Sequence, residues 1–205
     1  MQATGIILAG GKSSRMGTNK ALLKINGVTT VERVVTELRK IVDEIIIVTN
    51  SFEDYAFLNL PMVEDHWKGM GPLAGIHAGL TASKTEKNIV VACDMPFISY
   101  QFGKLLLQKL AQYQAAVPEI AGQLHPLFAA YRKEVKGEVE RAIQENQLKI
   151  RAILQHIHVK IVKDDEFENL GIRLDETFFY NMNHPNEYEN AINMFKNRSK
   201  ESRES

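Results

Sequence analysis

Apolar runs alternate with apolar positions at helical spacing along the first half of the chain. Continuous β-branched runs are typical of strands covered on both faces, whereas the i, i+3, i+4 spacing indicates an amphipathic helix. Pro72 suits the first turn of a helix, and Ser99 can cap the next one. We therefore expect strands at 5–8, 44–49, 62–64 and 88–92, and helices at 30–41, 72–82 and 100–113. This alternation predicts an α/β fold with a mostly parallel central sheet.

The rhythm changes beyond residue 113. Strands are expected at 115–118, 127–131, 159–162 and 178–180, and helices at 133–144, 149–154 and 185–195. Neither a repeat nor a linker interrupts the chain, so residues 1–195 are predicted to form a single domain. The polar, charged segment 196–205 (KNRSKESRES) is predicted to be a disordered tail.

Composition narrows the classes of function. The 205 residues are 44% apolar and 24% charged, which is ordinary globular usage, and the formal net charge is zero. A chain of zero net charge has no overall electrostatic field that would attract nucleic acid or an anionic membrane. Any anionic ligand must therefore be bound by a local cluster of positive charge. The single cysteine, Cys93, excludes an intramolecular disulfide and a Cys-rich zinc site. With no signal-peptide pattern and no membrane-length apolar run, the chain is predicted to be cytoplasmic.

A glycine-rich, basic loop follows the first predicted strand, at the sheet edge where ligands bind in parallel α/β folds. Glycines let backbone N–H groups surround a phosphate, and four cations lie around the same turn: Lys12, Arg15, Lys20 and Lys24. The run is not a Walker A loop, because Ile6 stands where that motif needs glycine, and it does not match the dinucleotide fingerprint. An ordinary loop with solvated lysines is the alternative, and the spaced cations favour phosphate binding.

Two further motifs follow predicted strands. Asp94 closes the strand at 88–92, where a carboxylate is well placed for Mg²⁺ bound to a triphosphate, although a turn or helix cap is the alternative reading. Cys93 beside it has no histidine close in sequence and is interpreted as a small buried residue. Residues 65–76 (DHWKGMGPLAGI) predict a constrained loop that feeds a helix and could present backbone amides, unless its glycines serve packing alone.

These motifs resemble a known family. Residues 8–20 (LAGGKSSRMGTNK) resemble the pattern LAGG-x-S-x-R-M-G-x-D-K of the molybdenum cofactor guanylyltransferases. The string CDMPF at 93–97 resembles the family's metal-site motif, and GPLAGI at 71–76 resembles the segment lining its guanine pocket. Asn19 departs from the pattern, which usually has aspartate, and His184 replaces a threonine near the chain end.

The resemblance implies a three-layer, Rossmann-like nucleotide-diphospho-sugar transferase fold and a Mg²⁺-dependent transfer of GMP from GTP. The acceptor would be the phosphate of molybdopterin or molybdenum-loaded molybdopterin, and pyrophosphate would be released. It assigns catalysis to Arg15, Lys20 and Asp94, and the metal to Asp94. It assigns the nucleotide to Leu8, Ala9, Gly10, Gly11, Lys20, Asp65, Gly71, Pro72, Leu73 and Asp94.

Acceptor and partners are less defined. Asn181 and Asn183 alternate along an extended segment and could face the acceptor, or they could simply form a turn before the last helix. Proteins that deliver molybdopterin are partners that the resemblance implies, whereas nucleic acid and membrane are not expected.

Two alternatives stay open. One is a related transferase that uses CTP or another phosphorylated acceptor. Gly10 and the run GPLAGI at 71–76 argue against the use of CTP, because many members that use CTP or UTP have alanine at the position of Gly10. The other is a nucleotide-binding module without catalytic activity. Only Asn19 and His184, which depart from the family pattern, favour it.

Overall fold

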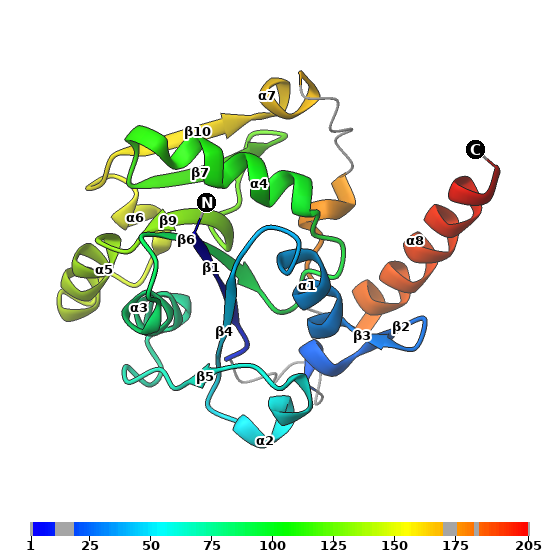
Figure 1. The fold of residues 1–205 in the computed structure, drawn as a ribbon, viewed down its shortest axis with the longest axis horizontal. Coiled ribbons are helices and arrows are strands. Elements are labelled where there is room, and N and C mark those ends of the chain that lie inside the picture. The colour runs from blue at the N-terminus through cyan, green and yellow to red at the C-terminus, as the bar shows by residue number, and fades with distance from the viewer. Residues whose placement is uncertain (1, 11–18, 170–175, 183–184, 205) are drawn as a thin grey trace.

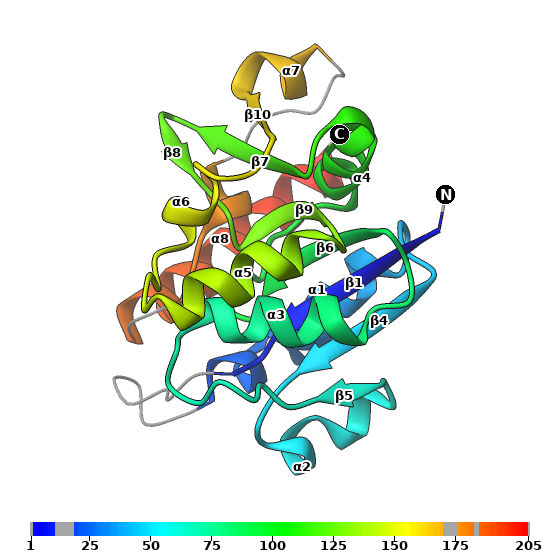
Figure 2. The same cartoon turned by 90° about the vertical axis from the view of Figure 1, so that its left-hand side faces the viewer.

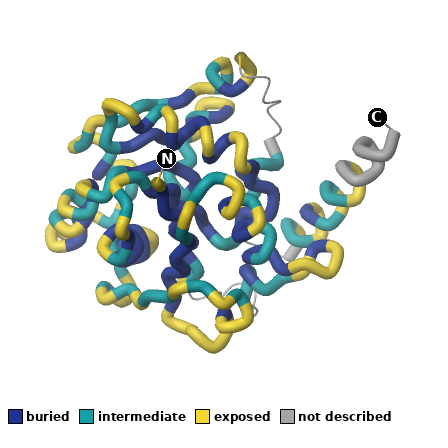
Figure 3. The backbone as a smooth tube through the Cα atoms, in the orientation of Figure 1, coloured by how far each residue is buried: buried dark blue, intermediate teal, exposed yellow. Residues whose placement is uncertain are grey.

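Helices cover both faces of one central sheet in the protein, whose structure here is a computed structural model (Figure 1). The structure describes residues 2–10, 19–169, 176–182 and 185–204. Turning the molecule by 90° shows the sheet between two groups of helices (Figure 2). The buried backbone gathers in the strands, while exposed positions lie on the outer sides of the helices (Figure 3). The predicted three-layer α/β architecture is confirmed.

The eight-stranded sheet has the order β10-β7-β9-β6-β1-β4-β5, with β8 paired to β7. Its strands are β1 (Ala3–Leu8), β4 (Glu44–Val48), β5 (Met62–Val63), β6 (Lys87–Ala92), β7 (Ala115–Ile120), β8 (Gln123–Leu124), β9 (Phe128–Arg132) and β10 (Val159–Lys163). β1 is parallel to both β4 and β6, and β5 is parallel to β4. β9 is antiparallel to β6 and β7, so the sheet is mostly, not wholly, parallel.

The helices begin and end close to the predicted positions in the first half of the chain. The α-helices are α1 (Thr30–Leu38), α2 (Phe52–Tyr55), α3 (Pro72–Ala82), α4 (Tyr100–Lys109), α5 (Val135–Gln144), α6 (Ile150–Ile153), α7 (Asp164–Glu168) and α8 (Pro185–Glu204). Short 3₁₀ helices are η1 (Lys20–Leu22), η2 (Ala56–Leu58), η3 (Leu110–Gln112) and η4 (Glu176–Phe179). Ser99 caps α4 as expected, because its side chain accepts from the Gln101 amide.

Side chains along the strands point alternately to the two faces of the sheet and form a hydrophobic core on each face. In β1, Ile6 and Leu8 face α3 and α5, whereas Ala3 and Ile7 face the opposite layer, which contains α1 and α4. Period-two alternation of this kind is what a strand buried on both faces produces. The sheet therefore needs helices on both sides, and the chain supplies them.

Helix α3 lies directly on β1 because one of its residues has no side chain. A Cβ added to Gly79 would meet Cγ2 of Ile6 at 2.3 Å, a contact that real Cβ atoms do not make. The glycine thus permits a close helix–strand approach. This contact fixes α3, and with it the loop that precedes Pro72, relative to the end of β1.

The last helix packs on a small hairpin formed by β2 (Lys24–Ile25) and β3 (Val28–Thr29). The Tyr188 hydroxyl donates to the Lys24 carbonyl at 2.7 Å, and Arg33 stacks over the Phe195 ring at 4.3 Å. A small apolar cluster lies between hairpin and helix: Ile25, Phe97, Met182 and Ala191. The chain end is therefore joined to the segment just after the glycine-rich loop.

One prediction was wrong near the chain end. The expected strand at 178–180 is the 3₁₀ helix η4, because the buried Phe179 packs against Phe102 and Phe128 and pairs with no strand. The last helix, α8, extends as far as Glu204, into the segment 196–205 for which the sequence predicts a disordered tail. Lysine, arginine and glutamate are good helix formers, which explains how a polar segment can extend a helix.

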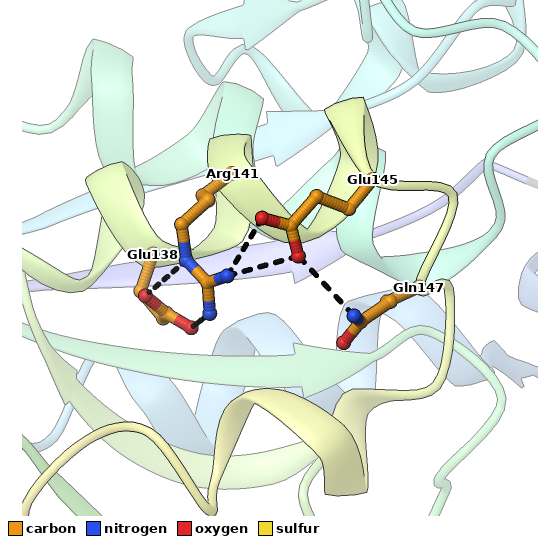
Figure 4. A network of polar contacts seen from close by, with 4 residues as sticks. All are labelled: Glu138, Arg141, Glu145 and Gln147. Carbon is orange, nitrogen blue, oxygen red and sulfur yellow. Dashed lines mark hydrogen bonds and ion pairs between the residues drawn. The ribbon is translucent and has the colours of Figure 1, made fainter.

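A network of charged and polar side chains lies on the outer surface around the end of α5. On α5, Arg141 bridges Glu138 and Glu145, and Glu145 also accepts from Gln147 (Figure 4). Arg141 pairs with side chains three and four positions away, the spacing at which residues are neighbours on a helix. Over the residues described, no helix has both the length and the apolar character needed to cross a bilayer.

Candidate nucleotide site

A cavity of about 890 Å³ lies at the carboxyl edge of the parallel strands. β1, β4 and β6 end there side by side, with Leu8 in register with Val48 and Ala92. Ligands bind at this edge in open α/β sheets. The described residues lining it are Leu8, Ala9, Gly10, Asn19, Val48, Thr49, Asn50, Ser51, Asp54, Asp65, Lys68, Gly69, Gly71, Pro72, Gly75, Ala92, Cys93, Asp94 and Leu127.

The start of the glycine-rich loop forms one wall. The Ala9 amide donates to the Val48 carbonyl at 2.8 Å, and the Cys93 amide donates to the Leu8 carbonyl at 3.1 Å. These bonds continue the sheet past the ends of its strands. Gly10 faces Asp65, because a Cβ at position 10 would lie 3.9 Å from Oδ2 of that carboxylate. The structure thus brings Leu8, Ala9 and Gly10 to the cavity; Gly11 and Arg15 lie outside the described residues.

Asp65 offers an unused acceptor. Its Oδ2 accepts from the Asn50 amide at 3.2 Å, whereas Oδ1 is buried and has no hydrogen-bond partner. A buried acceptor without a partner costs free energy, so such an atom is an expected position for a donor on a ligand. The hydroxyl groups of a ribose and the N–H groups of a base are donors of this kind.

Asp94 and Lys20 form the opposite end of the site. Lys20 Nζ lies 3.9 Å from Asp94 Oδ2, and each side chain is only 19% exposed. Burial raises the pKa of Asp94, although the neighbouring Lys20 acts to lower it. The sequence motifs at 8–20 and 93–97 therefore meet in space, as the resemblance implied.

The loop before α3 forms the third side. Gly71 has φ +67, a conformation that favours glycine, and Pro72 begins the helix at its first turn. Both line the cavity, so the positive end of the α3 dipole faces it. Leu73, in contrast, is fully buried in the core and does not line the cavity, so its assigned role in nucleotide binding has no support from the geometry.

Cys93 is not equipped as a nucleophile. Burial raises the pKa of its thiol to about 12, so the thiolate is scarce at neutral pH. This agrees with its interpretation as a small packed residue.

A multidentate metal cage is absent from the described part of the chain, where no three His, Cys, Asp or Glu side chains gather as ligands. Mg²⁺ does not need such a cage. It usually takes one or two carboxylates, with water and substrate phosphates as the other ligands. The partly buried carboxylate of Asp94 at the sheet edge fits that requirement.

One of the two expected acceptor residues, Asn181, lies near Asp94 in the structure. The Met182 amide donates to the Asp94 carbonyl at 3.2 Å, which brings the exposed Asn181 to this end of the site. Asn181 does not line the cavity itself, and Asn183 lies outside the described residues.

Five polar lining residues were missed from the sequence: Thr49, Asn50, Ser51, Asp54 and Lys68. Asn50 and Asp54 follow β4, and Lys68 lies in the loop after β5. Parallel strands share their carboxyl edge, and the sequence analysis used this rule for the predicted strands at 5–8 and 88–92. The same rule applied to the strand at 44–49 would have predicted Asn50 at this edge.

The sheet order, the loop after β1 and the carboxylate after β6 define a nucleotidyltransferase of the nucleotide-diphospho-sugar transferase fold. Residues 5–162 match the model of the MobA-like NTP transferase domain. The chain belongs to this family, whose nucleotidyltransferases typically use a divalent metal.

Known relatives agree over the full length. The chain is 39% identical to a probable molybdenum cofactor guanylyltransferase of Carboxydothermus hydrogenoformans, covering 94% of this chain and 96% of the relative. It is 37% identical to a probable molybdenum cofactor guanylyltransferase of Pelotomaculum thermopropionicum, covering 96% and 95%. The crystal structure of molybdopterin-guanine dinucleotide biosynthesis protein A from Archaeoglobus fulgidus superposes with a TM-score of 0.79, at 25% identity, over 95% of this chain and 99% of that one.

Proposed function

We propose that this enzyme transfers GMP from GTP to the terminal phosphate of molybdopterin, with or without bound molybdenum, and releases pyrophosphate. Residues 1–195 would act as one catalytic domain. The observation that carries the proposal is the meeting of Leu8–Gly10, Asp65, Gly71 and Asp94 around one cavity, in a chain 39% identical to a named guanylyltransferase.

The cavity supports the assignment of the nucleotide. The backbone at Ala9 and Gly10 would approach the phosphates, which also face the positive end of α3. Asp65, with its unpartnered Oδ1, would accept hydrogen bonds from the ribose or the base. Asn50 would hold that carboxylate in place.

The reaction itself requires alignment more than side-chain chemistry. An oxygen of the acceptor phosphate attacks the α-phosphorus, a new P–O bond forms, and the bond to the bridging oxygen of the β-phosphate breaks. Pyrophosphate leaves with that electron pair. Lys20, beside Asp94, would neutralise charge that develops on the phosphates, and Arg15 is assigned the same role from the sequence. Asn181, next to the Met182–Asp94 bond, and Asn183 would face the acceptor.

Asp94 would hold the divalent metal, which we propose to be Mg²⁺. When bound, this ion supplies Lewis-acid neutralisation of phosphate charge. The contribution of the chain is a partly buried carboxylate just after β6, where the Met182 amide donates to the main-chain carbonyl of the same residue.

A nucleotide panel tests the proposal. Thermal unfolding is measured with Mg²⁺ and each of GTP, CTP, ATP and UTP. The unfolding midpoint should increase selectively with GTP. At about 100 times the Kd, binding adds roughly 2.7 kcal/mol. Pyrophosphate release should then require molybdopterin. A shift with CTP alone would move the protein to a related transferase, and GTP binding without pyrophosphate release would indicate a module without catalysis.

A further inference from the structure

Asn19 connects two short elements at the edge of the cavity. Its amide nitrogen donates to Asp54 Oδ2 at 3.1 Å. Its Oδ1 accepts from the Ala21 amide at 3.2 Å and thereby caps η1, the 3₁₀ helix that begins at Lys20. Asn19 therefore joins α2 to the element that places Lys20.

Tyr55 extends this connection to the sheet. Its side chain is 1% exposed, and its hydroxyl lies 3.2 Å from Asn19 Oδ1 and 3.3 Å from the Ala9 carbonyl oxygen. The Ala9 amide is itself bonded to Val48. Burial raises the pKa of Tyr55, so the hydroxyl keeps its proton at neutral pH and can donate.

The charges around the cavity make the residue type at position 19 important. Three carboxylates line the cavity among the described residues, from Asp54, Asp65 and Asp94. An aspartate at position 19 would add a fourth, within hydrogen-bond distance of Asp54. Two carboxylates so close repel each other, and together they disfavour a bound triphosphate.

We propose that Asn19, Asp54 and Tyr55 form a positioning unit for the nucleotide phosphates, and that positions 19 and 54 act as a reciprocal pair. One member carries the carboxylate and the other carries the amide that donates to it. In this chain the carboxylate is at position 54, so Asn19 is compensated by Asp54. The identity of the ligand rests on the proposed function; the pairing of the two side chains does not.

A charge-exchange experiment tests the pair. The Kd of GTP with Mg²⁺ is measured by calorimetry on the full chain for wild type, Asn19→Asp, Asp54→Asn and the double variant. Asn19→Asp should weaken GTP binding about tenfold, which corresponds to about 1.4 kcal/mol. The double variant restores one carboxylate and one amide, and it should regain most of the affinity. Asn193→Asp, an exposed position on α8, adds the same charge away from the cavity and should bind like wild type.

Unfolding without nucleotide gives an independent measurement. The midpoint should fall in Asn19→Asp and recover in the double variant. If wild type binds no nucleotide while this recovery is seen, the proposed function fails and the pair stands. If wild type binds GTP and Asn19→Asp binds it equally well, or the double variant is no better than Asn19→Asp, the reciprocal pair is refuted.

A second variant covers the case in which Asn19→Asp does not fold. Asn19→Ser removes the amide donor to Asp54, adds no charge and keeps an oxygen that can cap η1. We expect it to bind GTP several-fold more weakly than wild type. Affinity equal to wild type in this variant would overturn the positioning role.

Discussion

The two halves of the chain contribute to different parts of the molecule. Of the described residues that line the cavity, all except Leu127 come from the first 94 positions. The second half instead supplies an aromatic cluster, in which Phe102 packs against Phe167, Phe178 and Phe179. The first half therefore supplies the residues that line the cavity at the sheet edge, and the second half mainly supplies core packing.

This division follows from the order of the strands in the sheet as well as from their direction. β1, β4, β5 and β6 are parallel, so their carboxyl ends and the loops after them converge on one edge. β9 is antiparallel to β6 and β7, so its carboxyl end points away from that edge, and it separates β7 and β10 from the strands of the first half. Substitutions in the two halves should consequently separate stability from activity.

The largest effect is expected in the aromatic cluster. Phe167 is fully buried and stacks on Phe102 with ring centroids 4.4 Å apart. Phe167→Ala should lower the free energy of unfolding by about 3–5 kcal/mol, because it removes a packed ring and leaves a cavity. Denaturant unfolding measures this. Phe57→Ala, at a 54% exposed ring, is the matched control and should cost far less. A selective loss of GTP affinity in folded Phe167→Ala would contradict the division.

In the first half, the reverse is expected. Asp94→Asn should reduce kcat/KM about a hundredfold or more, roughly 2.7 kcal/mol, because the amide is a poor ligand for a divalent metal. Its unfolding free energy should change by less than about 1 kcal/mol, since a partly exposed pair at 3.9 Å contributes little. Asp165→Asn on the exposed face of α7 is the control and should keep full turnover. Full magnesium-dependent turnover in Asp94→Asn would refute the metal assignment.

A pair of glycines tests the close helix–strand contact. Gly79→Ala should destabilise by about 1–3 kcal/mol, because its Cβ would meet Ile6 at 2.3 Å in a filled core. Gly137→Ala on α5 meets nothing within 4 Å and should stabilise by roughly 0.5–1 kcal/mol through helix propensity. Thermal unfolding of both variants measures the contrast. Equal effects of the same sign would show that the approach of α3 to β1 is looser than described.

The smallest effect is a dependence on pH in the second half. Burial lowers the pKa of His125, and Arg151 acts in the same direction. The unfolded chain therefore binds a proton before the folded one, so stability is present above the ordinary histidine pKa of about 6.5 and falls as pH drops through it. His125→Gln should show a smaller decrease in unfolding midpoint between pH 7.5 and 5.5. His77, whose pKa is also lowered by burial, should account for part of what remains.

The parts that local pattern governs were predicted well. The strands of the first half and the bounds of α3 follow from apolar runs, from Pro72 and from the glycines around it. The meeting of Asp94 with Lys20 follows from a general rule about parallel sheets, combined with the resemblance of both motifs to one family.

The errors have physical reasons. Phe179 looks like a strand residue, but ring stacking rather than sheet pairing buries it. The hairpin at 24–29 was missed although Asn26 and Gly27, both with positive φ, are a strong hairpin signal. The hydrogen bond between Asn19 and Asp54 joins positions 35 residues apart, and no local pattern encodes it.

The packing of α8 on the hairpin of β2 and β3 has a consequence for the order in which the protein folds during its synthesis. Ile25 and Phe97 are covered by Met182 and Ala191, and Tyr188 bonds to Lys24. A chain emerging from the ribosome presents its amino-terminal part first. The hairpin that follows the glycine-rich loop must therefore wait for almost the whole chain to be synthesised before its apolar side is covered. Nascent chains stalled before residue 182 would leave this apolar side exposed.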